Sequence, residues 1–158
     1  MDTETRKFVV FRLGVEEYGL PIDKVKSVIR FEKPTPVPRA PKGVEGVINL
    51  RGQVVPVVDL GKRLLGTVSE ESPTSRIVIA ETRWGLVGLV VDRARDVATF
   101  SAEDILPTPE TALTAETADA FEGVVSRDER LVILLDLDHA LSDAGLMLAT
   151  AQEGIADA

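Results

Sequence analysis

Short apolar segments, separated by polar residues, glycine and proline, recur along the whole chain. They lie at residues 8–13, 18–22, 44–50, 54–58, 76–80, 86–91 and 131–135, and they contain many Val and Ile residues. Their side chains either alternate between apolar and polar or stay apolar over four to eight positions, which is typical of β-strands. Long helical patterns do not separate successive segments, so the sequence predicts an all-β fold with short helices.

Two blocks of this pattern occur twice. YGLPIDKVKSV, from residue 18, aligns with VGLVVDRARDV at a shift of 69, and GVINLRGQVVPVVDLGKRL, from residue 46, aligns with GVVSRDERLVILLDLDHAL at a shift of 77. The repeat predicts an internal duplication with two lobes of four or five strands. Such short strands protect their edges best by curling into small barrels. We expect one domain over residues 8–141, with lobes at about 8–66 and 76–141, followed by a helix and frayed tail over 142–158.

Aspartates occupy matching positions in the two blocks. Asp59 and Asp136 each follow a strand and precede a short helical pattern. An aspartate there accepts hydrogen bonds from the free N–H groups of the first helical turn. We expect these two residues to cap helices and Asp23 and Asp92 to cap turns, so all four have structural rather than catalytic roles.

The segment NLRGQVVPVVDL places one arginine inside an apolar stretch. It predicts two strands joined at Arg51 and Gly52. Gly52 can adopt the left-handed conformation that ends a type I turn with a bulge. Arg51 would then lie at the exposed tip of a hairpin, where by itself it would only improve solubility.

Composition excludes several classes of function. The chain has 158 residues, a net charge of −8 and a pI of about 4.7, which disfavours nucleic acids and insertion into anionic membranes. There is no cysteine and only one histidine, His139, so we expect no metal and no cofactor. Nucleotide-binding glycine motifs, a signal peptide and a spanning apolar run are also missing, which favours a cytoplasmic binding or scaffolding protein.

Two other functions stay open on the residues alone. Carboxylates are plentiful, so a small hydrolase that uses two of them is possible if both face one cleft. An SH3-like module that binds proline-rich peptides would need an aromatic groove, for which Trp84 and Tyr18 are available. The proline-rich segment EKPTPVPRAPKG could itself be such a ligand, although a stiff loop is the simpler interpretation.

Four segments together resemble one known family. They are FVVFRLGVEEYGLPIDKVKSVI, VPRAPKGVEGVINLRGQVVPVVDLGKRLLG, GLVGLVVDRARDV and EGVVSRDERLVILLDLDHAL, and GVINLRGQVVPVVDL is the most specific part. From Phe8 to Leu141 the chain is similar to the CheW-type chemotaxis coupling proteins. The resemblance implies two five-stranded SH3-like barrels packed together, which agrees with the duplication.

The resemblance also implies a function. Such proteins are non-enzymatic adaptors that join the cytoplasmic tip of a chemoreceptor to the regulatory domain of the histidine kinase CheA in membrane-associated arrays, and we expect the isolated protein to be monomeric. The receptor's helical hairpin binds in an apolar groove between the lobes. Ser27 stands where some members have glutamate near the receptor contact. By resemblance, the receptor-binding residues are Arg51, Gly52, Asn49, Leu50, Val25, Val28 and Ser27.

Overall fold

The computed structural model describes residues 4–41, 43–66, 71–107, 120–142 and 148. All seven predicted strands are present in it, and three further strands, β3, β8 and β9, were not among the predicted segments. The strands are β1 Thr5–Leu13, β2 Glu16–Pro21, β3 Val25–Arg30, β4 Val44–Leu50, β5 Gln53–Asp59, β6 Arg76–Thr82, β7 Gly85–Val91, β8 Arg93–Ser101, β9 Phe121–Arg127 and β10 Arg130–Leu135. The short helical turns are η1 Ile22–Lys24, η2 Gly61–Leu65, η3 Ala102–Asp104 and α1 Leu137–Ala140.

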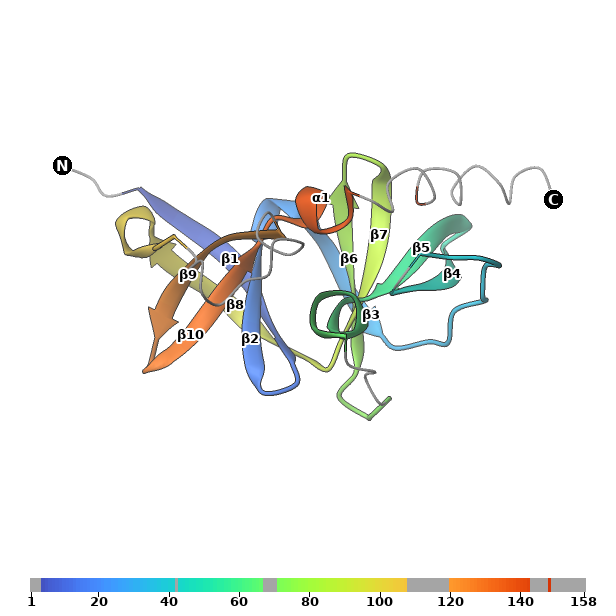
Figure 1. Ribbon diagram of the computed structural model, residues 1–158, viewed down its shortest axis with the longest axis horizontal. Coiled ribbons are helices and arrows are strands. Elements are labelled where there is room, and N and C mark those ends of the chain that lie inside the picture. The colour runs from blue at the N-terminus through green and yellow to red at the C-terminus, as the bar shows by residue number, and fades with distance from the viewer. Residues whose placement is uncertain (1–3, 42, 67–70, 108–119, 143–147, 149–158) are drawn as a thin grey trace.

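The strands form two five-stranded sheets that lie side by side along the long axis of the molecule (Figure 1). The first sheet has the order β8-β1-β2-β10-β9, and a bridge between Leu106 and Val124 brings the chain after β8 onto β9. The second has the order β3-β6-β7-β5-β4, and a bridge between Thr35 and Val47 brings the chain after β3 onto β4. We call these sheets barrel A and barrel B. The prediction of an all-β fold with two five-stranded lobes is confirmed.

The predicted assignment of one half of the chain to each lobe is wrong. Barrel A combines β1 and β2 with β8, β9 and β10, whereas barrel B combines β3, β4 and β5 with β6 and β7. The halves are joined by parallel pairs, β2 with β10 and β5 with β7. Parallel neighbours cannot be connected by a tight hairpin, so each barrel takes its parallel partner from a distant part of the chain.

The internal repeat itself is confirmed in three dimensions. β2 and β7 occupy equivalent positions, and so do the β4–β5 and β9–β10 hairpins. The two closing bridges are also equivalent, because Val47 and Val124 are related by the shift of 77 residues. Each copy of the repeat therefore contributes two strands to one barrel and three to the other.

The buried apolar residues form three clusters. One fills barrel A around Phe8 and Phe100, and one fills barrel B around Ile77 and Ile79. The third and largest cluster lies between the barrels and includes buried residues of β1, β2, β6 and β7, as well as Leu148. Burial of this size is the main source of stability in a domain, so the two barrels form one packed unit. Apart from Ser142 and Leu148, the predicted C-terminal helix and tail lie outside the described residues.

Candidate functional site

The β4–β5 hairpin presents Arg51 at its tip, as predicted, but its turn type differs from the prediction. Leu50 pairs with Gln53, so only Arg51 and Gly52 form the turn, and their φ angles are 53° and 84°. Two positive φ values define a type I′ turn, whose twist matches that of the flanking strands better than a type I turn. The side-chain Oδ1 of Asn49 accepts a hydrogen bond of 2.8 Å from the backbone N–H of Gly52. Arg51 and Gly52 are exposed, whereas Leu50 is half-buried and packs on the interior of barrel B.

The other three predicted contact residues lie on β3. Val25 is half-buried against the cluster between the barrels, whereas Ser27 is exposed and Val28 is 41% exposed. The pairing of β3 with β6 skips Lys26, so this residue forms a β-bulge. The Lys26 Nζ lies 2.9 Å from the Glu81 carboxylate. Val28 follows this bulge by two residues on an edge strand, where bulges redirect side chains and unpaired strand edges are open to partners.

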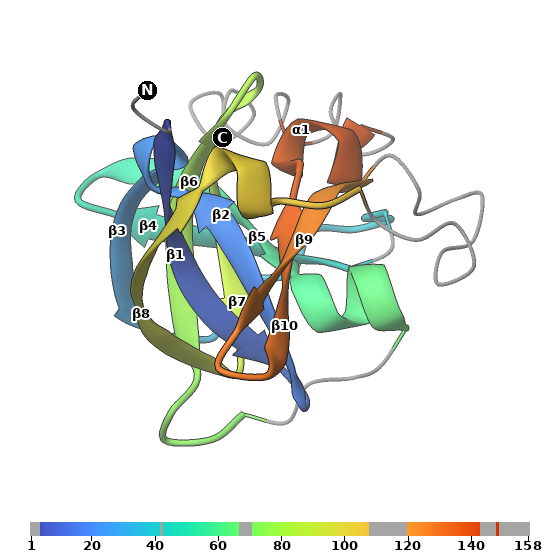
Figure 2. The same cartoon turned by 90° about the vertical axis from the view of Figure 1, so that its left-hand side faces the viewer.

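A residue that the sequence interpretation missed lies on β8. Val97 is 51% exposed, and the shift of 69 residues relates it to Val28. β8 is an edge strand of barrel A, as β3 is of barrel B, and Figure 2 shows both strands on the same side of the molecule. The repeat alone could have identified Val97, because it places this residue opposite Val28 in the alignment.

The structure thus places the predicted residues on two elements. Asn49 to Gly52 form the hairpin tip, and Val25, Ser27 and Val28 follow one another on β3. β3 and β4 are the two outer strands of the sheet in barrel B. Figure 2 shows the tip of the β4–β5 hairpin extending to the side of the molecule that β3 occupies.

The aspartates of the repeat have structural roles in most cases. The Asp59 carboxylate accepts a hydrogen bond from Lys62 N at 3.1 Å, and Asp136 accepts one from His139 N at 3.2 Å, so both predicted caps are confirmed. The predicted cap at Asp23 is wrong, because η1 has no side-chain cap. Asp92 accepts its hydrogen bond from Gly14 N at 2.5 Å and so holds the β1–β2 turn.

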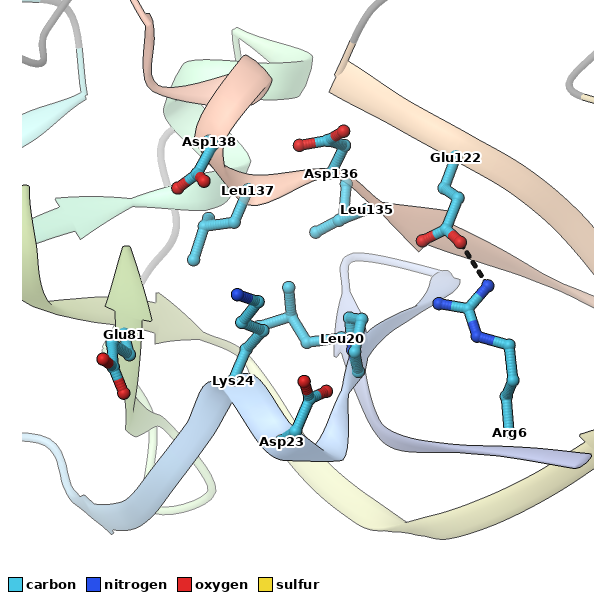
Figure 3. Close-up of a pocket in the computed structure, with 11 residues that line it drawn as sticks. Arg6, Leu20, Asp23, Lys24, Glu81, Glu122, Leu135, Asp136, Leu137 and Asp138 are labelled. Carbon is cyan, nitrogen blue, oxygen red and sulfur yellow. Dashed lines mark hydrogen bonds and ion pairs between the residues drawn. The ribbon is translucent and has the colours of Figure 1, made fainter. Parts of the chain in front are cut away.

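A cavity of about 450 Å³ lies where the cluster between the barrels meets the surface. Figure 3 shows Asp136 and Asp138 on one wall and Asp23 and Lys24 across from them. Several of its charged groups already have partners. Arg6 pairs with Glu122, Asp136 contacts the His139 ring at 2.7 Å, and Asp138 accepts a hydrogen bond from Arg83 N at 3.1 Å.

These pairings favour a structural role for the cavity carboxylates over the hydrolase alternative. Within the part of the chain that the structure describes, there is no group of three or more His, Asp or Glu residues that could hold a metal ion. The described helices also include none that is long and apolar enough to cross a membrane.

Tyr18 and Trp84, the two aromatic residues available for a peptide groove, both pack against the cluster between the barrels. Tyr18 is buried between the barrels, where its ring stacks on Phe11 and its hydroxyl donates to the Glu16 carboxylate at 2.8 Å. Trp84 is half-buried against the same cluster. In the proline-rich segment, Thr35 makes two backbone hydrogen bonds to Val47, so this part of the segment closes barrel B. Both proline-based alternatives are therefore disfavoured.

Comparison with known proteins decides the family. Residues 7–145 match the CheW-like domain. The chain belongs to the CheW-like domain family. It is 38% identical to the chemotaxis protein CheW of Rhizobium meliloti (strain 1021), over 84% of this chain and 85% of that protein. It is also 38% identical to the chemotaxis protein CheW of Bacillus subtilis (strain 168), over 85% and 86%.

A solved CheW structure has the same fold. The crystal structure of the scaffolding protein TtCheW from Thermoanaerobacter tengcongensis aligns with a TM-score of 0.77 and 35% identity, covering 86% of this chain and 87% of that one. The resemblance identified from the four sequence segments is confirmed. This CheW-like chain therefore belongs with scaffold proteins of chemotaxis signalling.

Proposed function

We propose that this protein is a non-enzymatic adaptor that couples the cytoplasmic tip of a chemoreceptor to the histidine kinase CheA. The observation that carries the proposal is the match to the CheW-like domain over nearly the whole chain. The pathway is chemotaxis or a related motility pathway. The protein would reach membrane-associated receptor arrays by binding their proteins, because its net charge of −8 opposes direct contact with anionic lipids.

The proposed receptor surface combines apolar and charged features of one side of the molecule. Val25 and Val28 on β3, with Val97 on β8, would supply apolar contact for a helical hairpin. Arg51 would supply a hydrogen-bonding and charged contact from the hairpin tip. Arginine is among the residue types most often found at energetic hot spots of protein interfaces.

The roles of the remaining turn residues differ from that of Arg51. Asn49 fixes the turn through its hydrogen bond to Gly52, and Gly52 accommodates a φ of 84° without cost. Leu50 supports the hairpin from the barrel interior. We therefore expect these three residues to act on receptor binding mainly by holding Arg51 in place.

The proposal is tested by binding of a receptor cytoplasmic fragment and a CheA regulatory domain from the same genome. Arg51→Glu should fold normally, because an exposed substitution changes stability by no more than about 0.5 kcal/mol. It should weaken receptor binding by roughly 2 kcal/mol or more, as expected for an interface hot spot, and leave kinase binding largely unchanged. Gly52→Val is the control for loss of the hairpin, because a β-branched residue at this φ is strained and should lower the melting temperature. Wild-type receptor binding by a folded Arg51→Glu protein would refute the proposed surface.

A further inference from the structure

β8 contains a bulge that matches the bulge of β3. Val10 of β1 pairs with Asp96, and the next residue, Phe11, pairs with Ala94, so Arg95 is an extra residue in β8. The equivalent extra residue in β3 is Lys26, at the shift of 69 residues. The two edge strands therefore have the same irregularity two residues before Val97 and Val28.

The bulge determines which side chains of β8 face outward. After it, Ala98 and Phe100 point into barrel A and are buried, while Val97 between them and the bulge is exposed. A shift of one residue in a strand moves every side chain to the opposite face. The position of the bulge thus fixes Val97 on the outer surface.

The bulged Arg95 is held by an unusual partner. Glu17 of β2 is a buried acid, with a side chain only 5% exposed, and its Oε2 lies 3.6 Å from Arg95 Nε. Its Oε1 lies 3.0 Å from Arg130 Nη1. Neither carboxylate oxygen of Glu17 accepts a hydrogen bond, so both contacts are ion pairs only. Burial of a carboxylate is costly, and two partly exposed arginines offset that cost here.

Barrel B shows that closing a barrel does not require this acid. The residue equivalent to Glu17 is Leu86, which packs against the core of barrel B. There the bulged Lys26 pairs instead with Glu81, and both side chains are largely exposed. The buried carboxylate in barrel A therefore needs an explanation other than packing.

We propose that Glu17 is a positioning residue, which fixes the β8 bulge through Arg95 and so keeps Val97 in place for its partner. This role rests on the receptor surface described under the proposed function. Glu17 does not itself reach that surface, because it is buried. Its effect is on the geometry of β8, while Arg130 provides a second pairing to the same carboxylate that does not involve β8.

The test compares receptor-fragment binding and melting temperature of Arg95→Gln with the matched control Arg130→Gln, since each removes one ion pair from Glu17. Arg95→Gln should weaken receptor binding about fivefold, which corresponds to a loss of roughly 1 kcal/mol. Arg130→Gln should weaken it by less than about twofold. Glu17→Leu introduces the residue type found at the equivalent position of barrel B, Leu86. It should leave the melting temperature unchanged but weaken receptor binding as much as Arg95→Gln does. If Arg95→Gln does not fold, Arg95→Lys replaces it and should still bind more weakly than Arg130→Gln.

Two results would overturn the positioning role: binding by folded Arg95→Gln and Glu17→Leu within about twofold of wild type, or equal losses for the Arg95 and Arg130 variants. Arg51→Glu separates this inference from the proposed function. If Arg51→Glu weakens binding and Arg95→Gln does not, only the positioning role is wrong. If none of these variants weakens binding, the proposed receptor surface is wrong as well.

Discussion

Gly46→Ala tests the closure of barrel B most sharply. Gly46 lies in β4 with a φ of 147°, and a Cβ atom there would be 2.0 Å from the carbonyl oxygen of Thr35. This oxygen accepts a hydrogen bond of 2.9 Å from Val47 N, and Thr35 N donates one of 2.8 Å to Val47 O. An added methyl group therefore cannot be accommodated unless the closing bridge moves apart.

The cost follows from the contacts that would be lost. An unfavourable backbone conformation costs about 1–3 kcal/mol. Each of the two backbone hydrogen bonds contributes about 0.5–1.5 kcal/mol. We therefore expect Gly46→Ala to lower the free energy of unfolding by about 2–6 kcal/mol, a large part of the roughly 5–15 kcal/mol typical of a domain. For a chain of this length the melting temperature should fall by roughly 5–20 °C.

The assay is chemical and thermal unfolding followed by circular dichroism and by the fluorescence of Trp84, the single tryptophan, which packs against the cluster between the barrels. Gly52→Ala is the control. Gly52 also has a positive φ, but a Cβ atom there would meet nothing within 4 Å. This variant should therefore lose only about 1 kcal/mol through backbone strain. Gly123→Ala, whose Cβ would lie 2.6 Å from the Leu106 oxygen, should destabilise barrel A in a similar way. If Gly46→Ala is no less stable than Gly52→Ala, barrel B is not closed as described.

Two further predictions concern polar contacts. Arg63 Nε donates a hydrogen bond of 3.0 Å to the carbonyl oxygen of Ala140, and burial lowers the pKa of the guanidinium. Arg63→Ala should therefore lower the free energy of unfolding, measured in urea, by about 1–3 kcal/mol. Unchanged stability would show that this hydrogen bond does not stabilise the fold. The hydrogen bond from Arg127, 2.9 Å at its Nη1, lowers the pKa of Asp96. This pair therefore stabilises the fold above the ordinary aspartate pKa, and its contribution is lost as the pH falls through the lowered value. Asp96→Asn should reduce the slope of stability against pH in that acidic range, and an identical slope for both proteins would contradict the assignment.

Much of the fold could be predicted because apolar patterning and the internal repeat are local features of the sequence. Of the three missed strands, β3 and β8 are mostly exposed, and the bulges at Lys26 and Arg95 interrupt their alternation. The pattern could not show that β2 pairs with β10, because alternation identifies strands but not their partners. The lobe boundaries were wrong for that reason.

The candidate site was predicted in part for similar reasons. Arg51 was placed correctly at a hairpin tip, because glycine beside a charged residue between two apolar runs is a strong turn signal. The turn type was wrong, because a non-glycine residue with a positive φ, as at Arg51, is uncommon. Glu17 could not be recognised as buried, since it stands in a run of two glutamates that is typical of a solvated turn.

Coupling of receptor to kinase is the function proposed for this protein, and reconstituted kinase activity tests it most directly. Autophosphorylation of the cognate CheA would be measured with a receptor cytoplasmic fragment alone, with this protein alone, and with both. We predict strong stimulation only when both are present, and loss of that stimulation with Arg51→Glu although the variant remains folded. Equal kinase activity with and without this protein in the presence of receptor, or stimulation by this protein without any receptor, would contradict the account.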